Sequence, residues 1–238
     1  MKPITDILQD GQWRGRSAFV VGSGPSLKGF DFGLLRNELT IGVNDEYLWG
    51  PTIALAQDPR IVAGDGIPGR TPLFQNPAWY NGPHIPVYFE GHPDRPKYEA
   101  PDTVYKIGSA DGKQPFVWGK SLSEGLYYGA NAGMAALNLA DILGADPIYL
   151  LGFDARADAV ETHHHSNYPK EWTLDRAEDR EAVYGRWIKE FRVIAQYVRA
   201  EVLNFNPESG IDAFQKYELW PAADGAILAV PFTYARRL

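Results

Sequence analysis

The feature that most constrains the fold is a short apolar run near the start of the chain that ends in a glycine-rich turn. The run Ala18–Val21 contains no polar residue, which is typical of a strand buried on both faces of a sheet. The turn that follows consists of Gly22, Ser23, Gly24, Pro25 and Ser26. Because glycine lets a phosphate or another backbone approach closely, a buried strand entering such a turn is typical of a nucleotide site in an α/β sheet.

Two familiar nucleotide motifs are excluded by the residues around these glycines. A P-loop requires a Lys-Ser or Lys-Thr pair after its glycines, and this stretch has neither. A dinucleotide fingerprint requires a third glycine at the position that Leu27 occupies here. The alternative interpretation is a tight turn that connects a strand to a loop and binds no ligand.

Later apolar runs repeat the pattern of a buried strand that ends in polar residues. The predicted strands lie at 17–22, 39–44, 52–57, 147–153 and 201–205, with short ones near 86–89 and 103–107 and an edge strand at 226–230. Helices are predicted at 30–36, from residue 129 to the natural C-cap Gly144, and over 175–200. We therefore expect an α/β, Rossmann-like fold, in which a mostly parallel sheet has helices on both faces and binds ligands at its carboxyl edge.

Length and composition indicate one domain with a long insertion. The 238 residues, 45% of them apolar, can bury a sizeable core, and we expect a single domain over 1–238. Prolines are dense in residues 59–125, which predicts an irregular, Pro-rich insertion. This insertion is either an ordered loop packed by its own aromatic side chains or a lid over the site.

Charge and cysteine content exclude several classes of function. A net charge of −7 without a basic run argues against nucleic acid as a partner. The absence of cysteine excludes disulfides, cysteine-bound zinc and a thiol nucleophile. No secretory leader and no apolar run of membrane-spanning length is present, so we expect a cytoplasmic protein without a membrane span.

Polar residues that follow the predicted strands are the candidates for binding and catalysis. The amide of Asn44 can donate to and accept from a ribose or a phosphate, although asparagine is also common in turns. Asp154 ends the most apolar strand, where a carboxylate can bind a ribose hydroxyl, orient a histidine or hold magnesium. The alternative for Asp154 is a capping or salt-bridge role within the fold.

The run His163–His165 contains three of the five histidines of the chain. Adjacent residues of an extended loop point to opposite sides, so at most two of them can readily share one metal ion. No carboxylate lies nearby at the spacing of a zinc motif, and no metal ligand is assigned. A histidine with an ordinary pKa suits the deprotonation of a hydroxyl at neutral pH, and the alternative is a solvated polar loop.

Several stretches, in this order along the chain, resemble the bacterial sialyltransferases of glycosyltransferase family 42 and a broader domain group that includes archaeal hydroxymethylpterin pyrophosphokinases. These stretches are Gly22–Leu27, Val43–Asp45, Asn131–Gly133 with Leu143–Asp154, His165–Ser166, and Asn204–Ser209. Ser23 stands where the family has asparagine, and Ala132 where it has serine.

The resemblance implies a nucleotide site and a general base. The implied nucleotide-binding residues are Gly22, Ser23, Gly24, Pro25, Ser26, Asn44, Asp45, Asn131, Ala132, Gly133, Tyr168 and Asn206. The implied catalytic residues are His165, which matches the family histidine proposed as general base, and Asp154. Tyr168 is the one tyrosine where the family has a phosphate-binding pair.

Three functions remain open at this point. The first is a glycosyltransferase that moves a sugar from a nucleotide-activated, CMP-sugar-like donor to a hydroxyl acceptor, with no cofactor firmly implied. The second is an ATP-dependent pyrophosphokinase acting on a pterin-like hydroxymethyl substrate, with Mg²⁺ held by Asp154 or Asp58. The third is a nucleotide-binding domain without catalysis, which the replacements at Ser23 and Ala132 leave open.

Overall fold

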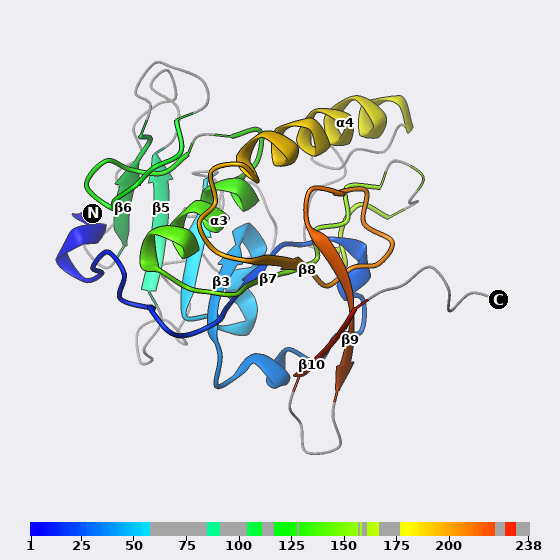
Figure 1. Ribbon diagram of the computed structural model, residues 1–238, viewed down its shortest axis with the longest axis horizontal. Helices are drawn as coiled ribbons and strands as arrows, with labels where there is room; N and C mark the ends of the chain where they lie inside the picture. The colour runs from blue at the N-terminus through cyan, green and yellow to red at the C-terminus, as the bar shows by residue number, and fades with distance from the viewer. Residues whose placement is uncertain are drawn as a thin grey trace.

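In the computed structural model of the chain, the apolar runs of the sequence pair into one ten-stranded sheet. The structure describes residues 1–57, 85–90, 104–110, 117–127, 129–156, 158, 161–166, 177–221 and 227–231. The strands are β1 (Lys2–Pro3), β2 (Ala18–Val21), β3 (Leu39–Val43), β4 (Ile53–Ala56), β5 (Ile85–Glu90), β6 (Tyr105–Gly108), β7 (Ile148–Leu151), β8 (Val202–Asn204), β9 (Gln215–Pro221) and β10 (Ile227–Pro231). Their order is β1-β6-β5-β4-β3-β2-β7-β8-β9-β10. All neighbours pair in parallel except β9 and β10, which form an antiparallel hairpin (Figure 1).

The strand order reverses at β2, which is the feature of the sheet that bears on ligand binding. From β2 the chain adds β3, β4, β5 and β6 on one side, and then returns to place β7 and β8 on the other. The chain therefore continues from β2 and from β7 toward opposite edges of the sheet. In open parallel sheets this switch point is where ligands bind.

One face of the sheet packs against α3 (Ala132–Leu143), and every residue of this helix is buried. The side chain of Asn131 caps its start by accepting a hydrogen bond from Met134 N at 3.1 Å. Gly144 ends it in the left-handed conformation, with φ of 81°. A helix that is buried on every side belongs in the centre of a core, and Figure 1 shows α3 lying against the sheet.

The opposite face of the sheet is covered by 3-10 turns rather than α-helices within the described part of the chain. These turns are η2 (Pro25–Leu27), η3 (Phe32–Leu35) and η4 (Asn44–Trp49). Their side chains pack on Phe19 and Val21, which point away from α3 because side chains alternate along a strand. The second layer is thus built by segments that also leave the carboxyl ends of β2 and β3.

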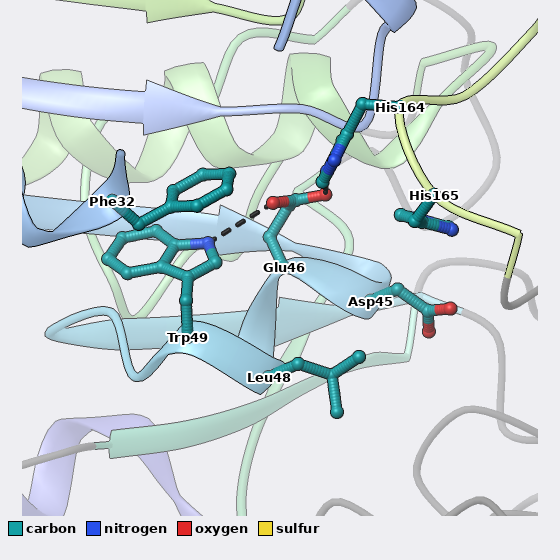
Figure 2. Close-up of a pocket in the computed structure, with 7 residues that line it drawn as sticks. All are labelled: Phe32, Asp45, Glu46, Leu48, Trp49, His164 and His165. Atoms are coloured by element: carbon teal, nitrogen blue, oxygen red, sulfur yellow. Dashed lines mark hydrogen bonds and ion pairs between the residues drawn. The ribbon is translucent and has the colours of Figure 1, made fainter. Parts of the chain in front are cut away.

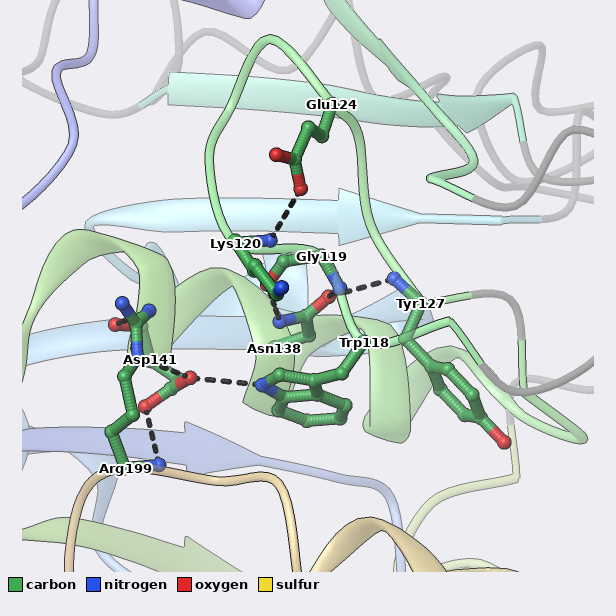
Figure 3. A network of polar contacts seen from close by, with 8 residues as sticks. All are labelled: Trp118, Gly119, Lys120, Glu124, Tyr127, Asn138, Asp141 and Arg199. Carbon is green, nitrogen blue, oxygen red and sulfur yellow. Dashed lines mark hydrogen bonds and ion pairs between the residues drawn. The ribbon is translucent and has the colours of Figure 1, made fainter.

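A buried polar network fixes the segment before α3 onto that helix (Figure 3). Asn138 accepts hydrogen bonds from Gly119 N at 3.1 Å and Tyr127 N at 2.7 Å, and it donates to Gly119 O at 2.9 Å. Asp141 accepts from Trp118 Nε1 at 2.9 Å. Because both side chains lie on α3, the end of the predicted insertion is attached to the core helix.

Most of the predicted elements are confirmed, with differences at their ends. The five main predicted strands correspond to β2, β3, β4, β7 and β8, and the short ones to β5, β6 and β10. The predicted long helix is α4 (Ala177–Ile194), which ends earlier than residue 200, and the helix predicted at 30–36 is the 3-10 turn η3. Residues 58–84, 91–103 and 111–116 of the predicted insertion and its boundary lie outside the described residues.

Two strands were not predicted, because neither has an apolar run. β9 mixes charged, polar and aromatic residues, and β1 contains only two residues. No helix within the described part of the chain is both long and apolar enough to cross a membrane.

Candidate functional site

The glycine-rich turn after β2 packs tightly on the segment after β7. Gly22 N donates to Leu151 O at 2.8 Å, and Gly24 N donates to Gly152 O at 2.9 Å. A Cβ atom at Gly24 would lie 1.8 Å from Asp154 Oδ2 and 2.4 Å from Gly152 O. At Gly24 the close approach that glycine allows is to the Asp154 side chain and the Gly152 carbonyl, and contact of this turn with a phosphate stays a prediction.

Asp154 holds the turn in place. Its carboxylate accepts hydrogen bonds from Ser26 N at 3.0 Å and from Ser26 Oγ at 2.8 Å, and the residue is 7% exposed. Burial raises the pKa of Asp154, while both hydrogen bonds from Ser26 lower it. This geometry matches the capping role considered for Asp154, and its catalytic role stays a prediction.

Three of the sequence stretches that suggested a nucleotide site meet around Phe153. A Cβ atom at Gly22 would lie 3.4 Å from the Phe153 ring, and one at Gly133 would lie 2.7 Å from it. Gly133 belongs to the first turn of α3, whose N-terminus carries partial positive charge. The glycine-rich turn, the start of α3 and the segment after β7 are therefore neighbours in space.

Two residues at this edge have a backbone conformation that side chains rarely adopt. Asn44, directly after β3, has φ of 55°, and Ala155, four residues after β7, has φ of 47°. The buried Asn44 Oδ1 has no hydrogen-bond partner within the described structure. Such strain and unsatisfied polar atoms cluster at functional sites, because other contacts must hold them in place.

The loop with the three histidines docks onto the same edge. His164 N donates to Ser23 O in the glycine-rich turn at 3.0 Å, and His164 Nε2 lies 2.9 Å from Glu46 Oε1 in η4. At the rim of this loop, Lys28 pairs with Glu161 at 2.7 Å, although both side chains are exposed and add little stability. The loop thus joins the segments that follow β2 and β3.

A pocket of about 200 Å³ lies where these segments meet (Figure 2). Its lining residues are Phe32, Asp45, Glu46, Leu48, Trp49, His164 and His165. Trp49 stacks on Phe32, with ring centroids 5.2 Å apart, and its indole N–H donates to Glu46 Oε2 at 3.1 Å. Of the residues predicted from the sequence, Asp45 and His165 line this pocket.

Burial shifts the pKa of Glu46 in the pocket and of His163 in the histidine loop. Glu46 is 1% exposed, and burial raises its pKa, while the hydrogen bond and charge of His164 lower it. Burial, followed by repulsion from His164, lowers the pKa of His163 to about 4. His163 is therefore neutral at pH 7, and its Nδ1 lies 2.9 Å from Thr162 Oγ1.

The remaining predicted residues have other positions. Asn206 is buried and its Oδ1 accepts from Glu208 N at 3.0 Å, as expected of a turn residue. Tyr168 and Asp58 lie outside the described residues. Glu46 was not among the residues predicted from the sequence. Its position directly after Asn44 and Asp45, at the end of a predicted strand, is the signal that could have indicated it.

Comparisons with known proteins give no relative for this chain. It has no match among protein-family models, and no significant match among curated proteins or solved structures.

Proposed function

We propose that this protein is a nucleotide-dependent transferase that moves a group from a nucleotide donor to a hydroxyl acceptor. The observation that carries the proposal is the convergence of three segments at the switch point of a parallel sheet: the glycine-rich turn, the start of α3 and the histidine loop. The resemblance to family 42 sialyltransferases makes a sugar on a CMP-like nucleotide the first candidate donor.

The start of α3 is the best place for the donor phosphate. The Asn131 side chain caps Met134 N. The backbone N–H groups of Ala132 and Gly133, which come before Met134 at the start of α3, have no acceptor within the helix. Together with the partial positive charge of the helix N-terminus, they favour an anion. Gly22 and Gly133 both face the Phe153 ring, so the start of α3 and the glycine-rich turn lie close to each other.

The pocket beside the histidine loop suits the reacting end of the substrates. Its volume of about 200 Å³ is below the roughly 300 to 1,000 Å³ of sites that enclose a whole ligand. It therefore suits an acceptor hydroxyl and its immediate surroundings. Activation of this hydroxyl is the proposed task of the loop, in which the resemblance implies His165 as the general base.

A second candidate is transfer of a diphosphate from ATP to a hydroxymethyl group. The observation in its favour is that Glu46, His164 and His165 bring three possible metal ligands together. Phosphoryl transfer depends on a cation that neutralises the transferred phosphates, whereas many sugar transfers need only a base. The donor that is consumed, ATP or a CMP-sugar, separates the two candidates.

The decisive experiment is calorimetric titration of the purified protein with CMP, CDP, UDP, GDP and ATP, with and without Mg²⁺. We expect one nucleotide to bind with a dissociation constant in the micromolar range, and a CMP-sugar to be consumed with a hydroxyl acceptor. Absence of binding by every nucleotide would overturn the proposal.

A variant then tests the histidine loop. His165→Ala should lower turnover by about 100- to 10,000-fold while leaving nucleotide affinity nearly unchanged, as for loss of a general base. His163→Ala is the matched control and should do much less. Equal damage from both variants, or none from either, would remove His165 from the reaction and leave the nucleotide site to be judged on binding alone.

A further inference from the structure

Three metal-ligating side chains meet in the pocket although no short sequence motif joins them. One ligand atom from each of Glu46, His164 and His165 lies within 4.8 Å of the other two. Glu46 belongs to η4 after β3, and the histidines lie 118 or more residues further along, in the loop docked on Ser23. We propose that Glu46, His164 and His165 form a binding site for one divalent transition-metal ion.

The donor set indicates which ions fit. Two imidazoles and one carboxylate that leave other positions open are typical of Fe²⁺, Mn²⁺, Co²⁺ or Zn²⁺. Mg²⁺ prefers oxygen ligands and gives up its waters reluctantly. The site is therefore distinct in chemistry from the magnesium ligands considered at Asp154 and Asp58.

The spacing also agrees with coordination. Ligands about 2.1 Å from an ion and at right angles to each other lie about 3 Å apart. His164 Nε2 and Glu46 Oε1 are 2.9 Å apart, as adjacent ligands of one ion would be. His165 lies next to them, with its ring centroid 4.9 Å from that of His164 and its plane nearly perpendicular (Figure 2).

The surroundings hold the ligands in this arrangement. The second carboxylate oxygen of Glu46 accepts from Trp49 Nε1, which fixes the side chain as hydrogen-bonded neighbours fix ligands in metal sites. The backbone bond between His164 N and Ser23 O fixes the histidine loop. His165 lines the same pocket and adds a third possible ligand beside the contact between Glu46 and His164.

His163 does not belong to the proposed ligand set. It stacks on His165, with centroids 5.6 Å apart, and its Nδ1 lies 2.9 Å from Thr162 Oγ1. A flexible run of three histidines that caught metal at the surface would use His163 as readily as the others. His163 is therefore the matched control within the same run.

An ion in this pocket changes the chemistry assigned to the loop. A coordinated imidazole nitrogen cannot accept a proton, so His165 would hold the ion rather than act as general base. A bound ion polarises a coordinated hydroxyl and lowers its pKa, which would activate the acceptor. The inference on metal binding does not require the proposed transfer, because it is tested with the metal ions alone.

The test is calorimetric titration of the full chain, freed of metal with EDTA and then dialysed, with Zn²⁺, Co²⁺ and Mg²⁺. We expect one Zn²⁺ or Co²⁺ per chain, and visible absorption from Co²⁺ that reports nitrogen and oxygen ligands. Mg²⁺ should show no comparable binding. Glu46→Gln and His165→Ala should each weaken Co²⁺ and Zn²⁺ binding by at least about tenfold, whereas His163→Ala should leave it unchanged.

Two results would overturn the proposal: no stoichiometric binding of Zn²⁺ or Co²⁺, or equal weakening by His163→Ala. Circular dichroism and thermal melting identify a variant that has failed to fold. If Glu46→Gln fails in this way, Glu46→Asp, which shortens the side chain by one methylene, takes its place and must still weaken binding. If the protein binds Zn²⁺ or Co²⁺ but none of the nucleotides, the proposed transferase is rejected and the metal site stands.

Discussion

Asp141 on α3 and Glu46 on η4 are buried carboxylates with similar partners. Each accepts a hydrogen bond from a tryptophan indole: Asp141 from Trp118 at 2.9 Å, and Glu46 from Trp49 at 3.1 Å. Each also contacts a basic side chain, Arg199 for Asp141 and His164 for Glu46, at 3.1 Å and 2.9 Å. The two sites differ in what surrounds these contacts.

The surroundings of Asp141 are closed by the fold itself (Figure 3). Its second oxygen accepts from Arg199 N at 3.0 Å, and Arg199 Nη2 donates to the Asp141 carbonyl at 2.9 Å. Arginine stays protonated at any ordinary pH, so this partner does not change. The neighbouring Asn138 has its amide oxygen and nitrogen both bonded to backbone. We interpret this network as structural.

The surroundings of Glu46 are open to a pocket (Figure 2). Its basic partner is an imidazole, the side chain that most often serves as a metal ligand. The adjacent Asn44 has a strained backbone and an amide oxygen without a partner in the described structure. Two carboxylates with the same kinds of donors thus have different surroundings, because one is enclosed by the fold and the other lines a pocket.

The largest predicted effect concerns the closed network. Asp141→Ala leaves Trp118 Nε1 and Arg199 N without their acceptor, and it should lower the free energy of unfolding by about 3 kcal/mol. Urea denaturation measures this change. At a temperature where the variant is folded, its Zn²⁺ affinity should equal that of the wild type; a weaker affinity would show that the two sites are coupled.

The next largest effect tests the packing of the glycine-rich turn. Gly24→Ala should lower the free energy of unfolding by about 2 kcal/mol, because the new methyl group would collide with Asp154 and the Gly152 carbonyl. Gly185→Ala in α4, where a Cβ would contact nothing within 4 Å, is the matched control. It should stabilise the protein by up to about 1 kcal/mol through helix propensity. Because the stability of Gly24→Ala is measured without added nucleotide, its loss reports the packing of the turn and not a contact with a ligand.

A smaller effect should appear as a pH dependence at Asp154. Burial raises the pKa of this carboxyl in the folded state, with Ser26 and Arg156 acting against it and Tyr184 facing it from α4. Its contribution to stability is therefore complete below the unfolded pKa of about 3.9 and is lost as the pH rises through the folded pKa. Relative to Asp154→Asn, the wild type should lose up to about 1.4 kcal/mol per pH unit within that window. Urea denaturation from pH 4 to pH 7 measures the difference, and a wild type that gains stability instead would contradict the raised pKa.

The smallest expected change in stability concerns Glu46. Glu46→Gln removes a carboxylate whose ionisation burial disfavours, and its amide oxygen can still accept from Trp49 Nε1. Without metal, the free energy of unfolding should change by less than about 1 kcal/mol. Denaturation of metal-free protein checks this value. A loss as large as that at Asp141 would mean that Glu46 is structural too, and the contrast between the two carboxylates would fail.

The sequence alone predicted most strands of the sheet, the core helix and the edge at which polar residues gather. Apolar runs such as Ala18–Val21 predict buried parallel strands, because only a strand covered on both faces tolerates such a run. Asn131 and Gly144 bound α3 through local chemistry, a side-chain cap and a left-handed glycine. Local signals of this kind need no knowledge of distant residues.

The tertiary structure decided which polar residues meet. Glu46 joins His164 and His165, and Asp154 fills the space at Gly24, although each pair is separated by more than a hundred residues. No periodicity encodes such contacts, because they depend on how loops from different strands pack at one edge of the sheet. The same packing decided that Asp141 is enclosed and that Glu46 faces a pocket. The sequence therefore places the site at the carboxyl edge, and only the folded chain selects its side chains.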